Sequence, residues 1–167
     1  MEAGHFALRR QGRVPKAVIT ELEHLLNDNA VGTLAMATLA DMAWLGEPLV
    51  LDDEAGRQEA ERLRNIIASS RPLAHPLQHY AEAALIVIGR PLGAQAVIED
   101  FDARVAAANN SVPSKSVHKL LHLWTCDGVL SSREAFEYCE TIRTSGRGLD
   151  YTEEELREGK LGRVGRP

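Results

Sequence analysis

Five acidic side chains carry the clearest potential for chemistry in this sequence. They stand in an amphipathic N-terminal segment, at the start of an apolar run, and directly after a short apolar segment: Glu21, Glu82, Glu99, Asp100 and Asp102. Carboxylate oxygens are the ligands that Mg²⁺ prefers, and an ion held by carboxylates can activate water and offset the charge of a phosphate. Acids that converge would therefore let the chain bind and cleave a phosphodiester.

Glu82 is the most informative of these acids. It lies at the start of the run AEAALIVIG, which has almost no polar face and predicts a buried helix. A buried unpaired charge is costly, so a carboxylate inside this run needs something positive facing it. The alternative is a first-turn acid at a solvated helix N-terminus, stabilised by the helix dipole.

The other acids also have structural alternatives. Asp102 can start a helix before Ala103 with Arg104 as its partner, and Glu21 can be a surface acid. The run Asp52-Asp53-Glu54 is best interpreted as the solvated start of a helix.

Histidine and cysteine patterns indicate structural roles. His118 and His122 have the i,i+4 spacing of a metal pair on a helix, but the sequence offers no third ligand. Cys126 and Cys139 both fall inside helical patterns, so we expect two packed thiols rather than a zinc knuckle or a disulfide framework.

Composition and charge limit the number of domains and the kinds of partner that the chain can have. A chain of 167 residues with 44% hydrophobic residues can form one compact domain, which we expect over residues 1–158 with a flexible tail over 159–167. The net charge of -5 disfavours bulk electrostatic binding of nucleic acid, so RNA would have to be drawn to cations at the acidic site. Neither a membrane span nor a signal-peptide pattern occurs, and we expect a cytoplasmic protein without membrane partners.

Helical patterns supply most of the framework that must position the acids. Apolar spacing and capping residues predict five helices in addition to AEAALIVIG: from Pro15 to about Asn27, from the Asp52-Asp53 pair to Ile67, from Ala103 onward, from Ser116 to Asp127, and from the Ser131 and Glu134 capping box onward.

Short apolar runs predict the strands. Leu49–Leu51 and Gln95–Ile98 each precede a helix, the order typical of a small parallel sheet flanked by helices. The acids after Ile98 would then lie at the carboxyl end of a strand, where ligands bind in open α/β sheets. Residues 30–46 stay open between a short buried helix and an irregular excursion, and the β-branched residues 86–88 leave a strand as the alternative there.

Three stretches resemble, in order, the PIN-like domains of prokaryotic toxin and antitoxin systems. VPKAVITEL resembles the family's "VP-x-AV-x-x-EL" helix, AEAALIVIG its "GEAEA" or "GEASA" helix start, and AVIEDFDARVAA its "l-x-TDD-x-x-AR-x-x-A" strand and helix. The segment from SVHKLLHLW to SGRGL is similar to the family's closing helices and turn. The resemblance covers roughly Gly12 to Leu149 and rests on the order and spacing of short motifs.

The resemblance implies a helix-rich α/β fold, a three-layer α/β/α sandwich with a small parallel sheet, and the activity of a metal-dependent endoribonuclease. Mapping the family's acids onto this sequence implies Mg²⁺ or Mn²⁺ held by four ligands, Glu21, Glu82, Glu99 and Asp100. Glu82 and Asp100 would be the catalytic pair, with Asp102 in reserve. RNA is the implied substrate, and the resemblance leaves an antitoxin protein and a second copy of the chain open as partners.

The sequence departs from the family's pattern in three places. The family's opening strand, which ends in an Asp, has no counterpart, because MEAGHFALRR resembles only the helix that follows it. The glycine and second acid of "GEAEA" are Ala81 and Ala84, and "TDD" reads IED. Either translation starts upstream, or the chain is a catalytically degenerate PIN-like module that binds RNA or a partner protein.

Overall fold

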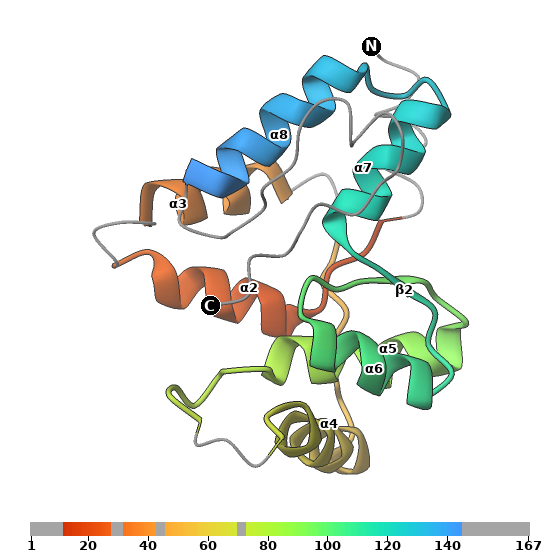
Figure 1. Cartoon of the computed structure of the whole chain (residues 1–167). Helices are drawn as coiled ribbons and strands as arrows, with labels where there is room; N and C mark the ends of the chain where they lie inside the picture. The colour runs from red at the N-terminus through yellow and green to blue at the C-terminus, as the bar shows by residue number, and fades with distance from the viewer. Residues whose placement is uncertain (1–11, 28–31, 43–45, 70–72, 145–167) are drawn as a thin grey trace. The chain divides into compact units, whose positions relative to one another are not determined.

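The computed structural model describes residues 12–27, 32–42, 46–69 and 73–144. Helices dominate this part of the chain (Figure 1). The chain divides into two compact units, the first over residues 2–115 and the second over residues 116–167. The expected tail at 159–167 lies outside the described residues.

The first unit begins with two helices that pack on each other. Helix α2 spans Lys16–Leu25 with Pro15 as its N-cap residue, which confirms the helix predicted from Pro15 with slightly tighter ends. Helix α3 spans Gly32–Asp41 and resolves the open assignment of residues 30–46 in favour of a helix over its middle part.

The predicted strand at Leu49–Leu51 is reduced to a single bridge, and the helix after it is confirmed. Leu49 forms an isolated parallel bridge with Pro15. Its N–H donates to the Val14 carbonyl at 2.9 Å, and its carbonyl accepts the Lys16 N–H at 2.8 Å. Helix α4, Glu54–Ile67, starts where Asp53 Oδ1 accepts the Gly56 N–H at 2.6 Å, a side-chain cap of the expected kind.

The apolar run AEAALIVIG forms a helix rather than a strand. Helix α5, Tyr80–Leu92, packs along α4 and buries a face of small and branched residues that includes Ala83 and Ile86. Gly93 ends the helix with φ +58°, a left-handed conformation that favours glycine.

A β-α-β unit completes the first unit. Strand β1, Ala96–Val97, pairs in parallel with strand β2, Ser114–Lys115, and helix α6, Phe101–Asn109, connects them. The helix starts two residues before the predicted Ala103, because Asp100 caps it. Strand β2 was not expected, since its residues SK carry none of the apolar pattern that predicts a buried strand.

The core of the first unit lies where α4, α5, α6 and the two short strands meet. It holds small alanines and a few larger aliphatic side chains: Ala60, Leu63, Ile67, Ala83, Ile86, Ala96, Ile98, Ala103, Ala106, Ala107 and Val112. Small residues let the helix backbones approach one another closely. The architecture is helix-rich with a small parallel two-stranded sheet in the described residues, consistent with the α/β class.

The second unit contains two helices that pack on each other and are connected by a short turn. Helix α7, Val117–Cys126, begins where Ser116 Oγ accepts the Lys119 N–H, and Gly128 adopts φ +70° in the turn after it. Helix α8 spans Ser132–Thr144. Leu121, Ala135 and Cys139 form the buried centre of this pair, with Trp124 and Phe136 among the partly buried side chains around it.

The predicted capping box at the start of α8 is confirmed. Glu134 Oε2 accepts the Ser131 N–H at 2.8 Å, and Ser131 Oγ accepts the Glu134 N–H at 3.2 Å. The backbone N–H of Ser131, followed by its hydroxyl, holds the pKa of Glu134 below its ordinary value.

One of the two thiol predictions is wrong. Cys139 is buried as expected, but Cys126 is exposed. Cys126 is the last residue of α7, and a residue type that is usually buried does not guarantee burial at a helix end. None of the described helices is long and apolar enough to cross a bilayer.

Candidate functional site

Glu82 lies in the first turn of α5, between the buried Ala81 and Ala83. Its side chain is half-buried, and its Oε2 atom is fully enclosed without a hydrogen-bond partner among the described residues. The residue before the helix, His79, has φ +61° and makes no side-chain cap. An enclosed carboxylate oxygen loses its hydration without replacement, which favours a cation or a donor group at this atom.

Asp100 has a structural task at the start of α6. Its Oδ1 accepts the Ala103 N–H at 2.7 Å, the side-chain bond of an N-cap. Arg104 secures the same corner, because its Nη1 donates to the carbonyls of Ile98 and Glu99. The carboxylate therefore sits on a well-fixed strand-to-helix turn, with its other oxygen, Oδ2, outside the cap bond.

Glu99 and Asp102 flank this turn. The Glu99 side chain is exposed, whereas Asp102 is half-buried in the first turn of α6. Both take part in side-chain or backbone interactions of their own. The prediction that the acidic cluster lies where a strand is followed by a helix is confirmed, although Asp102 already belongs to the helix.

Glu21 comes from α2 and is half-buried. Helix α5 packs against both α2 and α6, so it is the common neighbour of the elements that carry the other acids. Within the described ranges, however, no three His, Cys, Asp or Glu side chains are grouped so that they could hold a metal ion. The ligand set Glu21, Glu82, Glu99 and Asp100 therefore stays a prediction.

A histidine pair that the sequence did not reveal lies elsewhere in the first unit. His24, near the end of α2, and His75, in the loop before α5, place their Nε2 atoms 2.9 Å apart, and their ring centroids are 4.6 Å apart with planes tilted by 50°. Both side chains are exposed. The two residues are 51 positions apart, so no local spacing could have indicated the pair.

The two histidines with i,i+4 spacing behave differently. His118 is fully buried in α7, and His122 lies one turn further on, with its Nε2 3.5 Å from the exposed Cys126 Sγ. The i,i+4 spacing therefore contributes one side chain to the interior and one to a contact with a thiol.

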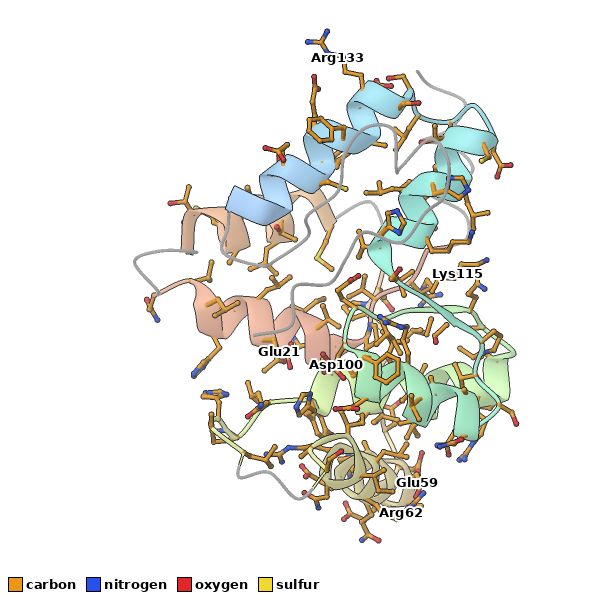
Figure 2. All side chains as sticks on the ribbon, viewed as in Figure 1. Glu21, Glu59, Arg62, Asp100, Lys115 and Arg133 are labelled. Carbon is orange, nitrogen blue, oxygen red and sulfur yellow. The ribbon has the colours of Figure 1, made fainter. Side chains whose placement is uncertain are left out.

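Charged side chains on α4 form a small network rather than a catalytic group. Arg62 donates from Nε and Nη2 to the two oxygens of Glu59 at 2.7 and 2.8 Å, and Arg90 of α5 approaches Glu59 at 3.9 Å (Figure 2). The hydrogen bonds from Arg62 hold the pKa of Glu59 below its ordinary value. A partly exposed pair of this kind contributes little stability.

An open groove runs beside this network. It has a volume of about 820 Å³ and is lined mainly by apolar side chains from the segment after Pro48 and from the end of α5: Leu49, Val50, Leu51, Val87, Ile88 and Leu92. Val50 is 53% exposed and Leu92 61%, so the groove presents real apolar surface to solvent.

Comparison of the chain with protein-family models, with curated proteins and with solved structures finds no match.

Proposed function

We propose that the chain is a PIN-like domain of the three-layer α/β/α type that hydrolyses phosphodiester bonds in RNA with the help of Mg²⁺ or Mn²⁺. Glu21, Glu82, Glu99 and Asp100 are the proposed ligands, and Asp102 is the reserve. The observation that supports the proposal most is the enclosed Oε2 of Glu82, which has no hydrogen-bond partner among the described residues.

The chemistry of the donor set fits such an ion. All proposed ligands are carboxylates, and Mg²⁺ and Mn²⁺ bind oxygen in preference to nitrogen or sulfur. A cation at Glu82 would satisfy the enclosed Oε2, and Asp100 could contribute Oδ2 while Oδ1 keeps its bond to the Ala103 N–H. The bound ion would supply an activated water and stabilise the charge that develops on the scissile phosphate.

Glu82 and Asp100 are the proposed catalytic positions, because both lie at helix starts, Glu82 in the first turn of α5 and Asp100 as the N-cap of α6. Their task is to hold the ion at a defined place relative to the RNA backbone. With a net charge of -5, the chain needs such cations to attract a polyanion at all. An antitoxin protein that covers the site and a second copy of the chain are the proposed partners.

Replacement of Glu82 by Gln tests the proposal directly. The substitution removes the charge and keeps the shape, so we expect the affinity for Mn²⁺ to fall at least about tenfold and RNA cleavage to be lost. Isothermal titration with Mn²⁺ and a cleavage assay on unstructured RNA measure the two effects. Thermal unfolding should show no loss of stability, since a partly buried charge is removed.

Glu23→Gln is the matched control. Glu23 lies on α2 two residues beyond Glu21, is exposed, and its carboxylate forms a solvated ion pair with Lys16 at 3.5 Å. Its replacement should change Mn²⁺ affinity and cleavage by less than about twofold. Cleavage that survives in Glu82→Gln would sink the assignment of the site.

A second candidate function is a non-catalytic PIN-like module that binds RNA or a partner protein. The open apolar groove beside α5 favours a protein partner, because exposed apolar surface of this kind is typical of interaction sites. Val50→Asp should then abolish partner capture without affecting Mn²⁺ binding. An intact chain that binds no Mn²⁺ and cleaves no RNA, but loses its partner in Val50→Asp, would decide for this candidate.

A further inference from the structure

The contact between His24 and His75 has an unusual geometry for a hydrogen bond. Their Nε2 atoms are 2.9 Å apart, a normal donor to acceptor distance, but the ring centroids are only 4.6 Å apart. Two imidazoles whose nitrogens point straight at each other would have centroids about 5.2 Å apart. At least one ring is therefore bent away from the line that joins the two nitrogens.

The same two distances fit two cis ligands of one metal ion. Imidazole nitrogens bind transition metals at about 2.0–2.1 Å. When the two metal–nitrogen bonds meet at a right angle, the nitrogens lie about 2.9 Å apart and the ring centroids about 4.5 Å apart. A tetrahedral angle would widen these distances to about 3.3 and 5.2 Å. The observed pair, at 2.9 and 4.6 Å, matches the right angle.

We infer that His24 and His75 form a two-histidine site for a divalent ion that prefers square-planar or octahedral geometry, of the class of Ni²⁺ and Cu²⁺. Imidazole nitrogen and right-angled coordination are the preferences of these two ions, whereas Zn²⁺ in proteins favours tetrahedral sites. No third His, Cys, Asp or Glu completes the group among the described side chains. Water or an external ligand can take the remaining positions.

Metal binding at His75 requires the loss of a hydrogen bond, which costs free energy. Its Nδ1 accepts the Leu77 N–H at 3.1 Å, which places the proton of the neutral ring on Nε2. A metal bound at Nε2 moves that proton to Nδ1, so the Leu77 N–H must turn away. Binding of the ion is thus linked to a rearrangement of the turn between His75 and Gln78, which is closed by the Gln78 N–H bond to the His75 carbonyl.

The site also connects two segments that are far apart in the sequence. His24 belongs to α2, and His75 to the loop that leads from α4 to α5. A bound ion would hold these segments together by bonds stronger than a single exposed hydrogen bond. This inference does not rest on the proposed nuclease site, which uses oxygen ligands and a different class of ion.

Titration of the full chain with Ni²⁺ tests the inference. We expect one dominant site whose affinity falls at least tenfold in His24→Gln and in His75→Gln. The double variant should be hardly weaker than either single variant, because a chelate is lost as soon as one ligand is gone. Electron paramagnetic resonance of the Cu²⁺ complex should report two imidazole nitrogens in the intact chain and one in each single variant.

Two controls keep the result interpretable. His79→Gln and His122→Gln remove histidines outside the pair and should leave the affinity for Ni²⁺ within threefold. His24→Gln should also leave Mn²⁺ binding unchanged, which separates this site from the one at Glu82. No Ni²⁺ binding by the intact chain, unchanged affinity in either pair variant, or an equal loss in His79→Gln would each overturn the inference.

Discussion

One side chain can have both a structural and a metal-binding role, and Asp100 is the candidate in this chain. The sequence placed it between a strand and a helix, and both a metal ligand and an N-cap fit that position. The structure gives the cap bond from Oδ1 to the Ala103 N–H at 2.7 Å. Capping does not exclude metal binding, since a carboxylate has two oxygens and the cap uses one.

Two substitutions at Asp100 separate these duties. Asn caps a helix about as well as Asp, so Asp100→Asn should leave the free energy of unfolding nearly unchanged, whereas Asp100→Ala should lower it by about 1 kcal/mol. If Asp100 also binds the ion, both variants should lower Mn²⁺ affinity at least about tenfold. Denaturant unfolding and Mn²⁺ titration measure the two effects. Full Mn²⁺ affinity in Asp100→Asn would restrict this residue to its structural role.

Residue patterns in the sequence predicted some candidate sites but not others. Glu82 could be singled out because a carboxylate inside an apolar run is conspicuous in one dimension, and its Oε2 is indeed enclosed. The pair of His24 and His75 could not, because its members are 51 residues apart in the sequence. Whether the four acids share one ion depends on distances between elements, which no local pattern encodes.

At the scale of elements, the helices were predictable because their signals are local. Side-chain caps at Asp53, Ser116 and the Ser131 capping box lie within a few residues of the backbone groups that they satisfy. The strands were predicted less well than the helices. Only one bridge forms at the predicted strand Leu49–Leu51, and β2 was not predicted. A strand of two residues is defined by its partner, and the partner is distant in the sequence.

Two glycines test how closely the helices of the first unit approach their neighbours. At Gly89, inside α5, an added Cβ would lie 3.4 Å from the Val112 side chain, an ordinary contact. Gly89→Ala should therefore raise the free energy of unfolding by about 0.5–1 kcal/mol through the better helix propensity of alanine.

Gly32, at the start of α3, is the contrasting case. A Cβ there would lie 2.5 Å from the Leu26 carbonyl oxygen, a backbone atom that cannot simply rotate away. Gly32→Ala should lower the free energy of unfolding by about 1–3 kcal/mol. Urea unfolding of the two variants side by side measures both effects. Equal stabilities would mean that α2 and α3 do not approach each other as closely as described.

For the whole molecule, the order of short apolar runs and helical patterns predicted a helix-rich chain with a small parallel sheet, and the described residues agree with that coarse class. The division into a unit that ends at Lys115 and a unit that begins at Ser116 left no mark in composition, because no Gly-rich or charged linker separates them. The full three-layer arrangement depends on the pairing of distant strands. It stays a proposal for the same reason that β2 was missed.

The bridge between Pro15 and Leu49 has a consequence for the order of folding. It closes a chain segment that is about twice as long as the one closed by the Ala96 and Ser114 pair of the sheet. Each doubling of loop length costs only about 0.6 kcal/mol in closure entropy, which slows formation about threefold. The stronger effect is that the bridge is stabilised by little burial, because no residue of α2 is fully buried once the bridge has formed.

During refolding, the amides of Ala96 and Ile98 should therefore acquire protection before those of Lys16 and Leu49. The first two donate to the Pro113 and Lys115 carbonyls beside the main core, so their bonds form together with the burial that stabilises them. Pulse-labelling hydrogen exchange resolves this order. Simultaneous protection of all four amides would mean that α2 and α3 belong to the folding nucleus rather than joining a core that already exists.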